Sequence, residues 1–210
     1  MFSFCIEGGL KIDRVTGEDT KFICSLALLW PADGRNFLIA TDGKIAAAVE
    51  VQANNLEPRL IPPACCDCTG ERIEVSESDG EFTVRPKPGR PFVEELPDDI
   101  EGKFPPVGAV FPFLGGDVVA FTVDAKRLSR LADAISGDDM VTFFIPRRPD
   151  KGLQVLDKPF VMVGRGENGA MKGLGVQMTI GDGKELECLE YAKKIIPLLP
   201  KKSIEFGEKK

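Results

Sequence analysis

The chain has 210 residues, of which 43% are apolar and 29% charged, which is enough hydrophobic material for one large or two small folded domains. It contains no histidine, which excludes Ser-His-Asp triads, Cys-His pairs and histidine-ligated zinc, and favours a binding protein over an enzyme. With 27 Lys and Arg against 33 Asp and Glu, the net charge is −6, so any attraction to nucleic acid must come from a local basic patch.

The first half of the chain carries strand patterns. Asp42-Gly43 and Asp79-Gly80 each stand between two apolar runs, and an Asp-Gly pair suits a two-residue turn that needs positive φ. We therefore predict an antiparallel meander with two tight hairpins. Its strands are expected over 2–6, 22–29, 37–41, 45–51, 72–75 and 81–84.

Residues 85–117 have a different composition, with seven prolines and an acidic block over 94–101. Because proline fixes φ and lacks a backbone N–H, this density predicts a connector without regular structure. A domain boundary is expected near Gly115-Gly116, which gives a first domain over 1–115.

The clearest helix follows this connector. Apolar side chains recur along 128–135 at helical spacing, Asp124 is a good N-cap residue, and Gly137 suits the C-terminal end. The opposite face is basic and carries Lys126, Arg127 and Arg130.

The rest of the chain alternates little between strand and helix. A second amphipathic helix is expected over 184–196, with Cys188 on its apolar face, followed by a charged and frayed tail from residue 201. We expect a second domain over 116–182, a C-terminal helix and tail over 183–210, and an α+β fold of antiparallel sheets with few helices. Its later strands are expected over 140–145, 152–155, 160–163 and 174–179.

Six cysteines are present, and Cys65, Cys66 and Cys68 form the most reactive cluster. One Cys-x-x-Cys pair without a second pair or a histidine does not complete a zinc site, so we expect free thiols and no metal or other cofactor. Soft-metal binding and redox use of the pair are the alternatives. The irregular cysteine spacing, the lack of a signal-peptide pattern and the short apolar runs indicate a cytoplasmic protein without a membrane partner.

Four short segments occur in an order that is similar to a known family. They are Ala-Thr-Asp-Gly at 40–43, Gly-Lys-Phe-Pro at 102–105, the helix within 121–135, and Lys-Pro-Phe-Val at 158–161. The first two are about sixty residues apart. The set resembles the bacterial sliding clamps, the beta subunit of the replicative DNA polymerase, and the resemblance covers roughly residues 1–179.

The resemblance implies a non-enzymatic processivity factor of DNA replication. Such a clamp closes as an oligomeric ring around duplex DNA, and its inner helices present Lys and Arg to phosphates without reading bases. It implies a homo-oligomer, with short peptides of polymerases or repair proteins as partners. The nucleic-acid contacts that it assigns here are Lys126, Arg127, Arg130 and Lys44. The peptide cleft is not located by any motif, and Phe111 and Phe113 are candidates for it or for the core.

The chain also departs from the clamp pattern. Lys44 and Ile45 stand where clamps usually have His-Arg, and the segment 60–65, where one inner helix should begin, contains two prolines. The region 16–22 is too short for the other helix of the first domain. A clamp-fold adaptor or regulator that binds proteins without encircling DNA is therefore the alternative function. A carboxylate- or metal-dependent enzyme is the third.

Overall fold

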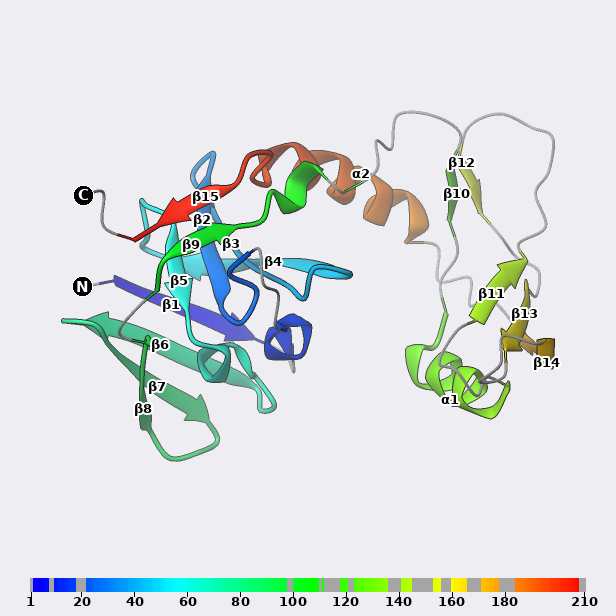
Figure 1. Cartoon of the computed structure of the whole chain (residues 1–210), viewed down its shortest axis with the longest axis horizontal. Helices are drawn as coiled ribbons and strands as arrows, with labels where there is room; N and C mark the ends of the chain where they lie inside the picture. The colour runs from blue at the N-terminus through cyan, green and yellow to red at the C-terminus, as the bar shows by residue number, and fades with distance from the viewer. Residues whose placement is uncertain are drawn as a thin grey trace. The chain divides into compact units, whose positions relative to one another are not determined.

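The computed structural model describes residues 2–7, 10–17, 22–97, 100–109, 111, 118–120, 123–135, 141–144, 153–155, 160–165, 171–177 and 184–207. The chain forms two compact units. Figure 1 colours the chain by residue number, from blue at the N-terminus to red at the C-terminus. The first unit comprises residues 1–112 together with 196–210, and the second comprises residues 113–195. The chain therefore leaves the first unit and returns to it. The boundary expected near Gly115-Gly116 lies outside the described residues.

The first unit is built on one eight-stranded sheet in the order β5-β2-β3-β4-β1-β6-β7-β8, and all neighbouring strands are antiparallel. This confirms the antiparallel pairing and the α+β class, but the strands do not form a simple meander, because β1 lies between β4 and β6 and β5 pairs with β2. The strands are β1 (Phe2–Glu7), β2 (Ala27–Ala32), β3 (Arg35–Thr41), β4 (Ala46–Ala53), β5 (Arg59–Ile61), β6 (Arg72–Ser78), β7 (Glu81–Lys87) and β8 (Phe92–Glu95).

Tight turns join two of the four hairpins of this sheet. Asp79-Gly80 turns between β6 and β7 with φ of 57° and 89°, as predicted, and Asp33-Gly34 does the same between β2 and β3 with φ of 52° and 71°. The prediction of a two-residue turn at Asp42-Gly43 is wrong, since Thr41 pairs with Ala46 and a four-residue loop joins β3 to β4. Side-chain hydrogen bonds within the loop stabilise the longer form, as described below.

One face of the sheet encloses the main hydrophobic core. Phe2, Phe4 and Ile6 alternate along β1 and are almost completely buried. Two short 3-10 helices contribute to the same core, η1 (Ile12–Val15) through Ile12 and η2 (Pro63–Cys66) through its thiols.

Strand β3 is buried on both faces. Phe37 and Ile39 point away from the main core, yet their exposure is zero, so a second layer covers this side of the sheet. The Trp30 indole N–H donates to the Leu198 carbonyl at 2.8 Å, and the Ile23 N–H donates to the Lys103 carbonyl at 2.8 Å, which brings this layer against the sheet. The layer consists of β9 (Gly102–Phe104) paired with β15 (Ile204–Phe206), and of η3 (Val107–Ala109) and η4 (Ile196–Leu198) (Figure 1).

Two expectations about irregular segments are therefore wrong. The stretch 85–117 contains the end of β7, all of β8 and β9, and η3, because most of its prolines stand between these elements. Pro86 lies inside β7, opposite Ile73 of β6. The tail expected to be frayed forms β15, whose Ile204 and Phe206 pair with β9.

The described residues of the second unit form two small sheets and two helices. Its three-stranded antiparallel sheet has the order β11-β13-β14, and α1 packs against β13 and β14. A parallel pair joins β10 to β12. The elements are β10 (Val118–Ala120), α1 (Ala125–Ile135), β11 (Val141–Phe144), β12 (Leu153–Val155), β13 (Phe160–Arg165), β14 (Met171–Gln177) and α2 (Glu185–Ile195).

Helix α2 confirms the predicted amphipathic segment, and Leu189 and Ile195 are buried. Cys188, which was expected on the apolar face, is instead exposed. Within the described residues, no helix is both long enough and apolar enough to span a bilayer.

Candidate nucleic-acid interface

Helix α1 begins at the predicted N-cap. The Asp124 Oδ1 atom accepts hydrogen bonds from the backbone N–H groups of Lys126 at 3.0 Å and Arg127 at 3.1 Å. These bonds satisfy two of the donors that a helix leaves unpaired at its first turn. Asp124 therefore fixes the position at which the basic residues of this helix begin.

The two faces of α1 differ as the sequence predicts. Leu128, Leu131 and Ala132 are half-buried on the side that packs on the sheet. Lys126, Arg127 and Arg130 are all exposed. We call these three residues the α1 basic face.

Most of the positive charge of the α1 basic face is available to an external anion. Arg127 contacts Asp124 at 3.4 Å from Nε to Oδ2, but its side chain is 76% exposed, and an exposed ion pair of this kind contributes under about 1 kcal/mol. Among the described residues, no carboxylate lies within ion-pair distance of Lys126 or Arg130. Asp133 is also exposed on this helix and offsets part of the charge.

Lys44 belongs to the first unit, in the loop between β3 and β4. The Asp42 Oδ1 atom accepts hydrogen bonds from the backbone N–H groups of Lys44 and Ile45, both at 2.8 Å. These bonds, with the Ile45 bond the stronger influence, lower the pKa of Asp42. Thr41 Oγ1 accepts from the Gly43 N–H at 3.1 Å and donates to the Ile45 carbonyl at 2.6 Å. The loop thus has a defined conformation that exposes Lys44.

The segment that begins at Leu60, where the clamp resemblance calls for an inner helix, forms the 3-10 helix η2. Residues 18–21 of the other such segment, 16–22, lie outside the described residues. Segment η2 has four residues, with Pro62 as its N-cap and Pro63 as its first residue, and Asp67 is already extended at its end. Segment η1 also has four residues. The expectation that the segment beginning at Leu60 cannot form a long helix is confirmed.

Two basic residues near η1 were missed by the sequence analysis. Lys11 is half-buried and Arg14 is exposed, and η1 contacts β3 and β4. The segment after η1 reaches the loop that carries Lys44, since Gly17 lies directly against Asp42. The available signal was that both basic residues precede the segment 16–22, where the resemblance calls for an inner helix.

Gly17 provides a test of this packing. A Cβ atom at Gly17 would lie 2.6 Å from the Asp42 Cβ, so Gly17→Ala must displace the loop that holds Lys44. We expect a loss of about 1–3 kcal/mol in the free energy of unfolding, measured by urea denaturation. Gly34→Asn is the matched control, because its added side chain meets open space and Asn tolerates positive φ. Equal stability of the two variants would contradict the assigned contact.

The cysteine cluster is built from buried thiols. Cys65, Cys66 and Cys68 have no exposed surface, and all six cysteines of the chain are free. Burial raises the pKa of Cys65 to about 12, with a smaller contribution from Glu94, and burial raises the pKa of Cys66 well above its usual value. No group of three or more metal-ligating side chains occurs among the described residues. These thiols serve the core, because a neutral buried thiol is a weak nucleophile.

Thiol labelling will distinguish these sites. With a pKa of about 12, only about one Cys65 side chain in ten thousand is a thiolate at pH 8, so its reaction with Ellman's reagent should be very slow. We expect one rapidly reacting thiol in the native protein, Cys188, and reaction of the five buried thiols only on unfolding. Cys188→Ser should abolish the rapid phase. A second rapid thiol in this variant would contradict the buried assignment.

The two candidate residues for the peptide cleft are Phe111 and Phe113, and the described residues do not bring them together in one site. Phe111 is half-buried, and Phe113 lies outside the described residues. Lys44 lies in the first unit, and the α1 basic face lies in the second.

Comparisons with known proteins identify the fold. No protein-family model and no curated protein matches the sequence. A sliding clamp from Bacillus subtilis superposes with a TM-score of 0.53 at 13% identity, over 97% of this chain and 57% of the clamp. One from Pseudomonas aeruginosa gives 0.50 at 12% identity, over 100% and 63%. The predicted clamp-like fold is thereby confirmed, and the chain spans less than two thirds of the length of these proteins.

Proposed function

We propose that this protein is a non-enzymatic, clamp-type platform that binds double-stranded DNA through phosphate contacts, in the cytoplasm and as a homo-oligomer. The observation that carries the proposal is the α1 basic face, exposed on a helix of a clamp fold. Contacts to phosphates do not depend on base sequence, which suits a protein that moves along DNA. Short peptides of polymerases or repair proteins are the proposed protein partners.

The acidic net charge is consistent with this role. A net charge of −6 repels DNA from most of the protein surface. The α1 basic face, formed by Lys126, Arg127 and Arg130, attracts DNA locally. An oligomer would present several copies of the α1 basic face, since each copy of the chain contributes one α1. The combination favours contact inside an assembly over binding by a single copy.

The shortness of η1 and η2 supports a second candidate function. These segments expose fewer basic side chains than two full helices could, and η2 has no basic residue in its last turn. A clamp-fold adaptor that binds proteins without encircling DNA would need no basic wall in the first unit. The two functions differ in whether DNA binding depends on the α1 basic face.

Ring formation is tested by combining mass and topology measurements. Size-exclusion chromatography with light scattering should give a discrete oligomer of at least two copies. Protein loaded on nicked circular DNA should remain bound in a spin column and dissociate when the circle is cut, because a ring slides off free ends. A stable monomer with no salt-dependent DNA affinity would refute the clamp proposal. A stable oligomer without DNA affinity would favour the adaptor.

A further inference from the structure

In the described part of the chain, the eight-stranded sheet of the first unit ends in two edge strands, β5 and β8. The element order repeats along the chain, as strand, 3-10 helix and three strands from β1 to β4, and again from β5 to β8. In the first repeat, the last strand returns to the first, because β4 pairs with β1 through Phe4↔Ala53 and Cys5↔Gln52. The equivalent pairing of β8 with β5 is missing from the sheet order. The repeat therefore leaves one seam open.

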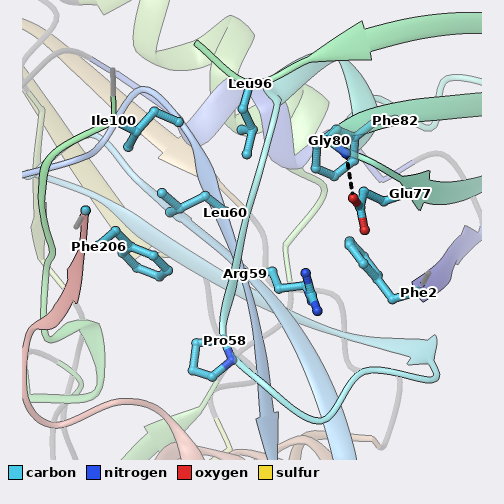
Figure 2. Close-up of a pocket in the computed structure, with 11 residues that line it drawn as sticks. Phe2, Pro58, Arg59, Leu60, Glu77, Gly80, Phe82, Leu96, Ile100 and Phe206 are labelled. Atoms are coloured by element: carbon cyan, nitrogen blue, oxygen red, sulfur yellow. Dashed lines mark hydrogen bonds between the residues drawn. The ribbon is translucent and has the colours of Figure 1, made fainter. Parts of the chain in front are cut away.

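A pocket of about 320 Å³ occupies this open seam (Figure 2). Residues beside both edges line it, Leu60 from β5 and Leu96 directly after β8. Most of the lining is apolar, and Figure 2 shows the aliphatic side chains gathered with Phe206 on one side. The aromatic and branched aliphatic lining residues are Phe2, Leu60, Phe82, Leu96, Ile100 and Phe206.

The other side of the pocket is charged. The guanidinium carbon of Arg59 lies 4.8 Å from the centre of the Phe2 ring, and its Nε donates to Asn55 Oδ1 at 3.2 Å. Glu77 approaches the same ring from its own side of the pocket (Figure 2). Its Oε1 atom accepts a hydrogen bond from the Gly80 N–H at 2.9 Å. An apolar pocket with charged groups at one end fits an amphipathic ligand.

The hydrogen-bond capacities of the two charged groups differ. A guanidinium has five N–H donors, and among the described residues the bonds of Arg59 leave its terminal nitrogens without a carboxylate partner. Glu77 already accepts a backbone donor that closes the β6–β7 turn. Arg59 is therefore the group with donors to offer, and a carboxylate matches its planar fork.

We propose that this pocket binds a small apolar monocarboxylic acid. Its hydrocarbon part packs against Leu60, Leu96 and Phe206, and its carboxylate accepts hydrogen bonds from Arg59. All the lining residues belong to the first unit, so the site exists whether or not the protein encircles DNA.

Binding of decanoate to the full-length protein tests the proposal. Isothermal titration below the micellar concentration should give decanoate an affinity at least about tenfold higher than that of decanol, because only the acid forms charge-assisted hydrogen bonds. Decylammonium should bind more weakly than either. Decanol binding as tightly as decanoate would overturn the proposal and indicate an uncharged occupant, such as an apolar peptide side chain. Tighter binding of decylammonium, or no binding of any of the three, would also overturn it.

Two substitutions with opposite expected effects on decanoate affinity test the roles of Arg59 and Glu77. Arg59→Met keeps the apolar stem and should weaken decanoate binding about tenfold while leaving decanol binding unchanged. Glu77→Gln removes the like charge and should strengthen decanoate binding by several-fold. Arg85→Met is the matched control, since Arg85 is exposed on β7 and bonds Ser76 outside this pocket. Equal decanoate affinity in Arg59→Met and the wild type, or weaker binding in Glu77→Gln, would contradict the assignment.

Discussion

A chain truncated after Ile195 is expected to lose the folded state of its first unit. Leu199 and Phe104 are 3% and 0% exposed, and removing the segment 196–210 deletes the first and uncovers the second. Losses of buried side chains of this size cost about 2–5 kcal/mol each, against a typical total stability of about 5–15 kcal/mol. The truncation also removes β15 from β9 and the carbonyl that accepts the Trp30 N–H.

The measurement is urea denaturation followed by the fluorescence of Trp30, the single tryptophan of the chain. Because Trp30 contacts the deleted segment through Leu198, the truncated chain should show an unfolded-like signal without a cooperative transition. Leu199→Ala should retain the transition, with the free energy of unfolding lowered by about 2–5 kcal/mol. Glu205→Gln should change it by less than about 1 kcal/mol, since the pair with Lys103 is exposed. A truncated chain with the wild-type midpoint would show that the segment is dispensable.

Local patterns predicted the elements of this protein better than their ends. The alternation along β6 and β7 and the left-handed turn at Asp79-Gly80 are local, so the hairpin was predictable from adjacent residues. Asp42-Gly43 is the same dipeptide but lies in a four-residue loop, because the side chains of Thr41 and Asp42 form hydrogen bonds with the backbone of the loop. Turn length here depends on flanking hydrogen-bond groups and not on the Asp-Gly pair alone.

Long-range closure was not predictable from the sequence. The segment 204–206 is short and its neighbours are charged, so nothing in it indicates pairing with β9, about a hundred residues earlier. The same holds for the pocket at the open seam, which depends on how the sheet brings Leu60 near Leu96. Sequence periodicity identifies which face of a strand is buried, but not which distant segment covers it.

The residues of the candidate site also divide into those that local sequence patterns predict and those that depend on long-range packing. The α1 basic face followed from helical spacing and an N-cap, both local, and the structure has the helix, the cap and the exposed side chains. Lys11 and Arg14 were missed because Lys11 precedes, and Arg14 lies within, a 3-10 segment too short to give a periodic pattern. Their position beside the Lys44 loop depends on the packing of Gly17 against Asp42.

Reversing the charge of the α1 basic face is expected to have the largest effect on DNA binding. In the variant with Lys126, Arg127 and Arg130 all changed to Glu, affinity for duplex DNA should fall on the order of a hundredfold at 0.1 M salt. The slope of log affinity against log salt should decrease by roughly two to three, because each phosphate contact contributes about 0.9. Fluorescence anisotropy with a labelled duplex over a salt series measures both quantities.

Helix α1 should remain folded in the charge-reversed variant, so a loss of DNA affinity can be attributed to the lost basic side chains. Lys126 and Arg127 lie in the first turn of α1, where acidic side chains interact favourably with the helix dipole. All three residues are exposed, so the substitutions bury no charge. The matched control reverses Arg85, Lys87 and Arg90, three exposed basic residues of the first unit. It produces the same change in net charge and should leave most of the salt slope in place.

The pair of variants separates a local contact from general attraction. If both reduce the slope equally, net charge governs binding and the α1 basic face has no special role. If neither changes affinity in a protein that forms a stable oligomer, the adaptor function is favoured. A reduction confined to the α1 variant means that a protein of net charge −6 binds DNA through one basic helix, as a clamp-type platform requires.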